Sequence, residues 1–207
     1  YLIMKNNAVG VVGNGFVGGA IIQGFTTFKE VFSYDKDPLK TIDSLEDVLD
    51  CEYIFVCLPT PMISVEGGKC NLSIMENFFK EIEYKEEQVF IIKSTVPVGT
   101  TQKLREEYNL PNIVHCPEFL TARTARSDFI SASRTIIGGE PKYTEKVKRL
   151  FEDRFPGTPV YLTNSNESEL IKYSSNCFFA TKVMFFNEIK LLADKLGMDW
   201  DTVIQGL

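Results

Sequence analysis

The sequence predicts an α/β fold, a doubly wound parallel sheet followed by one long helix. Short apolar runs, such as those at 53–58, 88–93 and 112–116, alternate with amphipathic stretches from residue 7 to about residue 164. Continuous apolar runs are typical of parallel strands that are buried on both faces. We therefore expect a Rossmann-type domain over residues 1–165 and the start of a helical, dimer-forming domain over residues 166–207.

A glycine-rich turn follows the first predicted strand. Val9–Val12 is a short apolar run that leads into a GxGxxG turn and then into an apolar helix. In this spacing the first glycine permits a tight turn, the second lets a pyrophosphate approach the backbone, and the third lets the helix pack on the strand. The free N–H groups of the helix would bind the phosphates. The candidate dinucleotide-binding residues of the turn are Gly13, Asn14, Gly15, Phe16, Val17 and Gly18.

An acidic residue ends the second predicted strand. Asp35 follows the apolar run 31–34, roughly 20 residues after Gly13, where folds of this kind place the carboxylate that binds the ribose. A carboxylate bonds the 2′-hydroxyl of NAD, and it repels a 2′-phosphate by about 4 kcal/mol at 4 Å in an effective dielectric of about 20. Lys36 and Lys40 would weaken that repulsion. NAD is favoured over NADP, and a surface Asp beside a chance turn is the alternative.

Composition excludes several classes of function. The 207 residues carry a net charge of −6 with no Lys/Arg cluster, which argues against a nucleic-acid partner. No apolar run reaches the roughly 18 residues that a membrane span needs. The five cysteines form no CxxC or metal-type cluster, so we expect no metal site and reduced thiols in the cytoplasm. They are Cys51, Cys57, Cys70, Cys116 and Cys177.

Three predicted strands end in chemically rich segments. The segments 58–61, 93–101 and 115–120 each contain proline and leave hydroxyl or carboxyl groups at the strand end. In open α/β sheets, ligands bind outside the carboxyl ends of the strands. Ordinary turn chemistry explains any one of these segments. Three of them beside a dinucleotide turn favour a functional crevice.

A long helix is expected from residue 167 to about residue 196. Asn166 with Glu169 resembles a helix cap, as does Ser73 with Glu76 earlier in the chain. The middle of the long helix is apolar nearly all round, so we expect it to be buried between two domains or two subunits.

Two polar residues begin one face of this long helix. Lys172 and Asn176 are four residues apart and share that face, which continues as an apolar stripe. Polar groups in this position are costly unless they meet a polar partner, and a solvated first turn is the alternative.

Together these motifs resemble the N-terminal part of the UDP-glucose/GDP-mannose dehydrogenase family. The matching pieces run from Ala8 to Leu207 in family-like order. They are Gly-Asn-Gly-Phe-Val-Gly (13–18), Asp35 with Lys40, Cys-Leu-Pro-Thr-Pro (57–61), Ser-Thr-Val-Pro-Val-Gly-Thr-Thr (94–101), Cys-Pro-Glu-Phe-Leu (116–120), and 172–188 with Lys172, Asn176, Asn187 and Glu188.

The resemblance implies that the CH2OH group of a nucleotide-linked hexose is oxidised to a carboxylate with two NAD⁺, through an aldehyde and a cysteine thioester. UDP-glucose is the first substrate to test, and a homodimer through the long helix is expected. The implied catalytic residues are Thr95, Glu118, Lys172 and Asn176. The implied cofactor residues beyond the glycine turn are Asp35, Lys40, Pro59, Thr60, Ser94 and Thr95, and the implied substrate residues are Glu118, Phe119, Leu120, Lys172 and Asn176.

Two departures from the family pattern stand out. The family's nucleophilic cysteine lies in a Cys-Phe-Pro-Lys-Asp motif after the long helix, and none of the five cysteines has that context. We therefore expect that this chain lacks the catalytic cysteine and the C-terminal nucleotide-sugar-binding domain. In addition, Ala122 stands where the family usually has Glu, and Arg123 stands where Gly is usual.

Two other functions remain open on the sequence alone. A β-hydroxyacid dehydrogenase of the 6-phosphogluconate type also joins a dinucleotide domain to a long helix with Lys and Asn four apart, but it lacks the Pro-Glu-Phe-Leu segment. A non-catalytic NAD-binding dimer module would explain the missing cysteine motif and Ala122. The single histidine, His115, lies among apolar residues, and we interpret it as a packing residue.

Overall fold

The computed structural model describes residues 4–63 and 68–207. The chain divides into two compact units, Tyr1–Lys172 and Tyr173–Leu207. The domain boundary expected after residue 165 remains a prediction.

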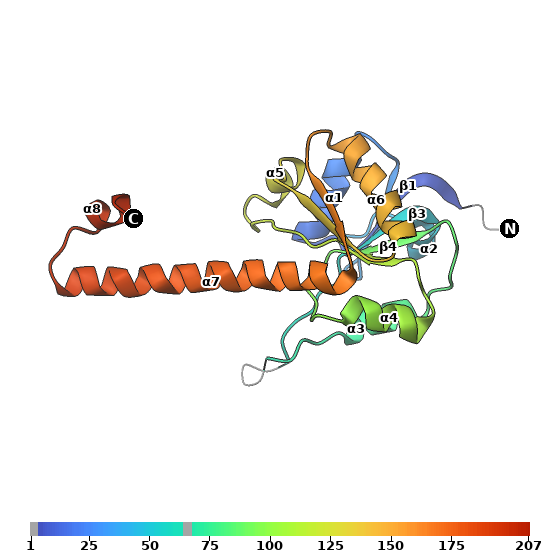
Figure 1. Ribbon diagram of the computed structural model, residues 1–207. Helices are drawn as coiled ribbons and strands as arrows, with labels where there is room; N and C mark the ends of the chain where they lie inside the picture. The colour runs from blue at the N-terminus through green and yellow to red at the C-terminus, as the bar shows by residue number, and fades with distance from the viewer. Residues whose placement is uncertain (1–3, 64–67) are drawn as a thin grey trace. The chain divides into compact units, whose positions relative to one another are not determined.

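The first unit is built on a seven-stranded sheet with the order β2-β1-β3-β4-β5-β6-β7 (Figure 1). The strands are β1 Lys5–Val12, β2 Val31–Tyr34, β3 Cys51–Val56, β4 Val89–Ile92, β5 Ile113–His115, β6 Thr135–Gly138 and β7 Val160–Thr163. The helices of the chain are α1 Phe16–Phe25, α2 Leu45–Leu49, α3 Ser73–Lys80, α4 Thr100–Tyr108, α5 Ala125–Ile130, α6 Pro141–Arg154, α7 Ser165–Lys195 and α8 Trp200–Gln205. The predicted α/β class is confirmed.

Helices cover both faces of the sheet, with α1, α5 and α6 on one face and α3 and α4 on the other (Figure 1). Successive strand residues therefore enter two different cores. In β3, Phe55 packs under α1 and α6, whereas Ile54 and Val56 pack with α2 and α3. This two-sided burial explains why the strands are apolar throughout rather than alternating.

One core is dominated by phenylalanine. Five rings lie with neighbouring centroids 5.5 to 6.4 Å apart, mostly tilted or edge-on. Offset and edge-on arrangements are the favourable ones for aromatic pairs. The rings are those of Phe25, Phe55, Phe129, Phe151 and Phe155.

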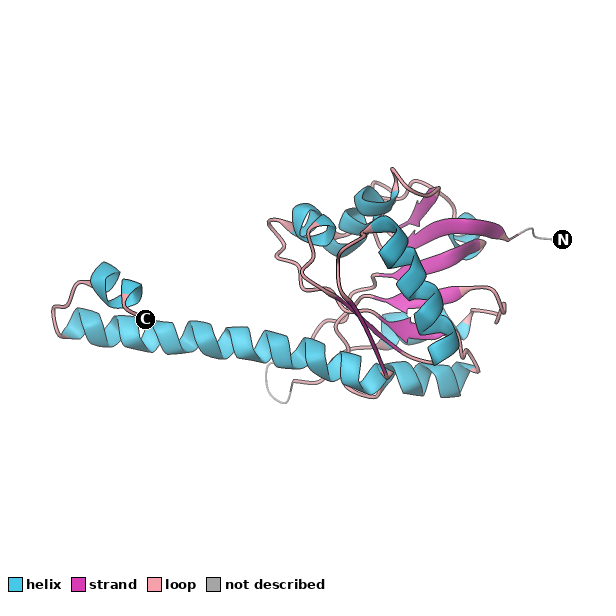
Figure 2. Cartoon of the chain, turned by 45° about the horizontal axis from the view of Figure 1, so that its top comes forward, coloured by secondary structure: helices cyan, strands magenta, loops and turns pink. Residues whose placement is uncertain are grey.

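The first five strands run parallel, but β6 runs antiparallel to β5 and β7 follows the direction of β6. His115 at the end of β5 pairs with Gly138, and Gly138 pairs in turn with Thr163 at the end of β7. Figure 2 shows the strands side by side with the helices outside them. The reversal brings the start of α7, at Ser165, to the carboxyl end of β5.

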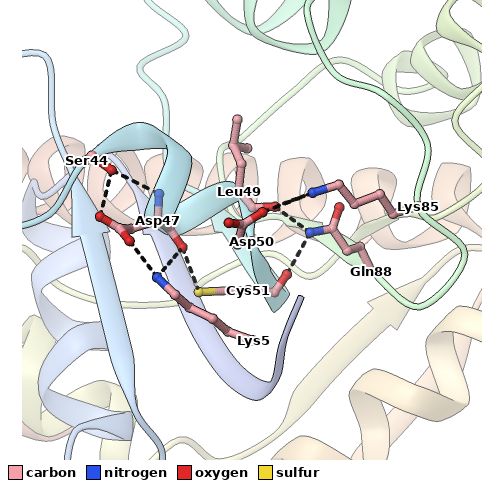
Figure 3. A network of polar contacts seen from close by, with 8 residues as sticks. All are labelled: Lys5, Ser44, Asp47, Leu49, Asp50, Cys51, Lys85 and Gln88. Carbon is pink, nitrogen blue, oxygen red and sulfur yellow. Dashed lines mark hydrogen bonds and ion pairs between the residues drawn. The ribbon is translucent and has the colours of Figure 1, made fainter. Parts of the chain in front are cut away.

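A polar network connects the amino ends of β1, β3 and β4 (Figure 3). The Lys5 ammonium lies 2.7 Å from Asp47, and the Gln88 amide donates to the Cys51 carbonyl at 2.9 Å. Burial raises the pKa of the Cys51 thiol to about 12, which keeps that thiol neutral. Because this network lies at the amino ends of the strands, it supports the sheet and leaves the carboxyl ends clear for a site.

Both predicted side-chain helix caps are wrong in detail. α3 has no capping box, because the Asn71 side chain instead accepts the Ser73 N–H at 3.0 Å. α7 begins at Ser165 rather than at residue 167, because the Asn164 side chain accepts the Glu167 N–H at 2.9 Å. In each case an Asn two or three residues upstream acts as the acceptor.

The second unit contains most of α7 and the short helix α8. Its helix ends at Lys195, and Gly197 follows in the left-handed region with φ of 66°, as expected for a residue that stops a helix. Large apolar side chains are exposed along this part of α7, among them Phe178, Phe179 and Val183. Among residues 4–63 and 68–207, no helix is long and apolar enough to cross a membrane.

Candidate active site

The glycine turn lies between β1 and α1, at the point where β1 has β2 on one side and β3 on the other. Gly13 has a φ of 94°, and a Cβ there would lie 2.6 Å from the Cys57 carbonyl oxygen. A Cβ on Gly18 would overlap the Gly13 carbonyl. Gly15, in contrast, has open space in front of it, so its backbone is accessible to a ligand. The three glycines thus have the geometry that a dinucleotide turn requires.

Asp35 is held beside this turn by backbone donors. Its carboxylate accepts the Asn14 N–H at 2.7 Å and the Asp37 N–H at 2.8 Å. Burial alone would raise the pKa of Asp35, but these two N–H groups and the Lys40 charge outweigh it and lower the pKa. Asp35 is therefore anionic, and it still has acceptor capacity for a ribose hydroxyl.

A hollow of about 670 Å³ lies next to Asp35 and Lys40. Its walls are largely apolar, as an adenine ring requires. The apolar residues that line it include Leu45, Leu49, Pro59, Phe78 and Ile82. The residues that fit the adenosine half of a dinucleotide are thus together on one side of the turn.

The ends of β3 and β4 are tied to each other by their own hydroxyl groups. Thr60 Oγ1 donates to the Thr95 carbonyl at 2.7 Å, and Ser94 Oγ donates to the Leu58 carbonyl at 2.5 Å. These two hydroxyls therefore hold the loops in place. The Thr95 hydroxyl makes no hydrogen bond with any residue that the structure describes, so it is available to a ligand.

A second hollow, of about 260 Å³, starts at the glycine turn and passes these strand ends. Its lining joins Gly15 and Val17 of the turn to Thr60, Thr95 and Glu118. The structure therefore brings the residues predicted for the nicotinamide side next to the carboxylate predicted for catalysis.

Glu118, which lines this hollow, forms an ion pair with Lys172. Lys172 Nζ lies 2.9 Å from Glu118 Oε1 and also donates to the Glu118 carbonyl at 2.5 Å. Only 6% of the Lys172 side chain and 17% of the Glu118 side chain are exposed. The other carboxylate oxygen accepts the Leu120 N–H at 2.5 Å, and Lys172 Nζ lies 5.3 Å from the centre of the Phe119 ring. The polar partner that Lys172 needs is therefore Glu118.

Two further polar residues fix the helix turn that carries Lys172. Ser168 Oγ lies 2.7 Å from His115 Nδ1. The buried Glu169 carboxylate accepts the Gly99 N–H at 2.6 Å, the Thr101 N–H at 2.8 Å and the Thr101 hydroxyl at 2.6 Å. Burial raises the pKa of Glu169, and the hydrogen bonds offset this only in part. The sequence pattern indicated no role for Ser168, and Glu169 is not part of the helix cap at Asn166 that the pattern predicted.

Close approach of α7 to the sheet depends on a glycine. A Cβ on Gly138 would lie 2.5 Å from the Asn164 carbonyl oxygen and would also overlap the Ser168 side chain. The Gly-Gly pair at the end of β6 was the available signal for this contact.

His115 and Lys93 are buried near the Lys172–Glu118 pair. Burial lowers the pKa of His115 to about 3, and the Lys93 and Lys172 charges act in the same direction. The imidazole is therefore neutral, in agreement with the interpretation of His115 as a packing residue. The buried Lys93 ammonium donates to the Pro117 carbonyl at 3.3 Å and was missed from the sequence. Asn176 belongs to the second unit, so its part in the site remains a prediction.

The motifs and the site geometry coincide with one family. The family model for the NAD-binding domain of UDP-glucose/GDP-mannose dehydrogenases matches residues 38–154, and the model for the central domain of the same family matches residues 166–207. The chain belongs to the UDP-glucose/GDP-mannose dehydrogenase family. NAD is accordingly the cofactor of this domain, and the turn and Asp35 fit it.

Several curated members of this family are similar to the chain. It is 32% identical to a UDP-glucose 6-dehydrogenase of Streptococcus pneumoniae over 79% of this chain and 44% of that protein. It is 35% identical to UDP-glucose 6-dehydrogenase YwqF of Bacillus subtilis over 75% of this chain and 37% of that protein. An uncharacterised protein of Methanocaldococcus jannaschii is 36% identical over 77% of this chain and 19% of its own length. The chain thus spans less than half the length of these relatives.

Solved structures of family members share the fold. A UDP-glucose dehydrogenase of Pyrobaculum islandicum matches with a TM-score of 0.83 and 23% identity, over 98% of this chain and 56% of that one. A GDP-mannose dehydrogenase of Pseudomonas aeruginosa matches with a TM-score of 0.80 and 23% identity, over 95% of this chain and 55% of that one.

Proposed function

We propose that this chain is the cofactor-binding and sugar-oxidising part of an NAD-dependent nucleotide-sugar 6-dehydrogenase. The observation that carries the proposal is the buried Lys172–Glu118 pair, because the Glu118 side of this pair lines the same hollow as the glycine turn. When bound in this crevice, NAD⁺ supplies the acceptor for the hydride, and two are used for each sugar. The reaction converts the sugar CH2OH group into a carboxylate.

In this proposal Lys172 and Asn176 bind the reacting oxygen of the sugar. A cation placed beside that oxygen stabilises the negative charge that develops as its proton leaves. Glu118 is the acid/base, since a carboxylate in a partly dry crevice can exchange protons with a neighbouring oxygen or water. The Thr95 hydroxyl lines the same hollow and is available to help order that water.

Substrate contacts extend along the segment after β5. Phe119 and Leu120 follow Glu118, and the substrate oxygen would replace one of the bonds that Lys172 now makes to Glu118. The second oxidation needs a thiolate nucleophile. The family's nucleophilic cysteine lies in a Cys-Phe-Pro-Lys-Asp motif, and none of the five cysteines of this sequence lies in such a motif.

UDP-glucose is the substrate we propose, and the enzyme would work in the cytoplasm as a homodimer through the second unit. Several similar curated proteins are named UDP-glucose 6-dehydrogenases, while others are named UDP-N-acetyl-D-mannosamine dehydrogenases. Rates of NADH formation with a panel of nucleotide sugars therefore identify the substrate.

The proposal is tested by NADH formation with the intact protein. We expect an absorbance increase at 340 nm that depends on UDP-glucose and reaches two NADH for each sugar. Faster turnover with UDP-N-acetylmannosamine or GDP-mannose would correct the substrate. Tight NAD binding with no turnover on any nucleotide sugar would instead support a non-catalytic NAD-binding module.

Replacing Lys172 tests the catalytic pair directly. We expect Lys172→Ala to lower kcat by roughly 10²- to 10³-fold, because the developing oxyanion loses its cation. NAD affinity should stay within about twofold, since Lys172 lies beyond the cofactor turn. Lys182→Ala, which removes an exposed lysine farther along α7, is the matched control and should retain the parent rate. Unchanged steady-state rates in Lys172→Ala would rule out this role.

A further inference from the structure

A third hollow starts at the amino end of α1 and runs along one side of that helix, and its lining is basic. Its lining contains Asn14, Gly15 and Phe16 of the turn, Gly19 and Gln23 of α1, Lys40, Arg123 of the loop before α5, and Arg126 on the first turn of α5. Of the described residues that line this hollow, three are cations and none is a carboxylate. In a chain whose net charge is −6, such a local cluster of positive charge attracts an anionic ligand.

Among the residues that the structure describes, no carboxylate neutralises either arginine. Arg123 and Arg126 are exposed and make no ion pair with any residue that the structure describes. The acid nearest in sequence, Asp128, is occupied by its own loop, since it accepts the Thr121 N–H at 2.8 Å and the Thr124 hydroxyl at 2.9 Å. Asp128 therefore fixes the fold of the loop and leaves the two guanidinium groups available.

The loop is held against α1 by packing. Phe129, four residues from Ala125 at the start of α5, is buried in the aromatic core. A Cβ on Gly24 would overlap the Phe129 ring, so α5 and α1 approach each other closely at this glycine. This contact keeps Arg126, on the first turn of α5, on the same side of the domain as the glycine turn.

We infer that Arg123 and Arg126 clamp the pyrophosphate of the bound dinucleotide against the amino end of α1. The guanidinium fork matches phosphate oxygens, and the helix end supplies N–H donors on the other side. The inference rests on the proposed NAD-dependent function. It also explains the two departures from the family pattern in this loop. Arg123 places a cation, and Ala122 removes a carboxylate, where the pyrophosphate would lie.

The test measures NADH binding to the intact protein by fluorescence titration, without turnover. The clamp variant is Arg123→Gln/Arg126→Gln. The control is Lys80→Gln/Arg149→Gln, which removes the same charge from exposed sites elsewhere in the domain. At low salt we expect the clamp variant to bind NADH about tenfold or more weakly, as expected when charge-assisted hydrogen bonds are lost. We expect the control to stay within about twofold of the parent.

The salt dependence of NADH binding distinguishes the loss of a phosphate clamp from a change in fold. Because ion pairs with phosphate are screened, NADH affinity of the parent should fall steeply as NaCl rises, and that of the clamp variant should fall less. Binding by the clamp variant with the parent affinity and salt dependence would overturn the clamp and leave the proposed function intact. Failure of the parent itself to bind NADH would overturn both. Far-UV circular dichroism of both variants should match the parent, since all four side chains are exposed.

Discussion

At the scale of single residues, Lys172 shows how a buried charge is accommodated. Its ammonium contacts the Glu118 carboxylate and the Glu118 carbonyl, and it lies beside the Phe119 ring. Breaking such a pair leaves one charge buried without a partner, which costs more than the pair itself contributes. The sequence predicted that Lys172 needs a polar partner. It could not predict which one, because the contact spans 54 residues and depends on the direction of β6 and β7.

His115 makes stability depend on pH. Its pKa is about 3 in the folded protein and near 6.5 in the unfolded chain. Between these two pH values the imidazole binds a proton in the unfolded state but not in the folded state. The free energy of unfolding therefore falls as pH decreases from 6.5 toward 3. The slope is at most about 1.4 kcal/mol per pH unit.

Substituting His115 isolates this effect. In urea unfolding between pH 7.5 and 4.5, we expect the parent to lose stability faster than His115→Gln, which keeps a polar partner for Ser168. Titration of the carboxylates is common to both proteins and cancels in the comparison. Parallel curves for the two proteins would contradict the assigned pKa shift of this single histidine.

At the scale of elements, the first two turns of α7 join three parts of the domain. Ser168 contacts β5, Glu169 binds the amino end of α4, and Lys172 meets the segment after β5. The sequence indicated the long helix and its Lys–Asn face. It did not indicate the docking residues, because a serine and a glutamate in a first helical turn are also typical of solvated caps.

Removing the Glu169 carboxylate should destabilise the first unit. Glu169→Ala leaves the Gly99 N–H, the Thr101 N–H and the Thr101 hydroxyl without their acceptor, and we expect a loss of about 2 to 3 kcal/mol in urea unfolding. Glu106→Ala removes an exposed glutamate from α4 itself and should change stability by less than about 0.5 kcal/mol. Equal stabilities of the two variants would show that the Glu169 carboxylate does not stabilise the amino end of α4.

At the scale of the whole molecule, the two units differ in how they bury apolar surface. The first unit has two complete cores, whereas the second exposes large apolar side chains along α7. The sequence predicted that this helix has to be buried by a second domain or subunit. Within the described residues, side chains such as Phe179 and Val183 are about 60% exposed, which leaves them for a partner surface.

A second copy of the chain is the partner that we expect. Light scattering coupled to size exclusion should give a dimer mass for the parent, and Phe179→Asp/Val183→Asp should shift it toward the monomer by placing charges on the apolar face. Thr181→Asp, on an exposed polar position of the same helix, should leave the mass unchanged. A monomer mass for the parent would exclude the homodimer.

The alternation of strands and helices, the glycine turn and Asp35 were all predictable, because each depends on local sequence. The reversal at β6 was not, since short apolar strands carry no signal for their direction. The basic hollow was not predictable either, because Lys40 and Arg126 come to line the same hollow through the packing of α5 on α1.

The spacing of Ser168, Glu169 and Lys172 has a consequence for how this chain tolerates insertions. An α-helix turns by about 100° for each residue, so one extra residue after Glu169 would leave both anchors in place and rotate the lysine away from Glu118. A domain altered in this way would still fold and still bind its cofactor. On the role proposed for Lys172, the angular position of one residue on the helix therefore distinguishes a protein that only binds a dinucleotide from one that also oxidises a sugar with it.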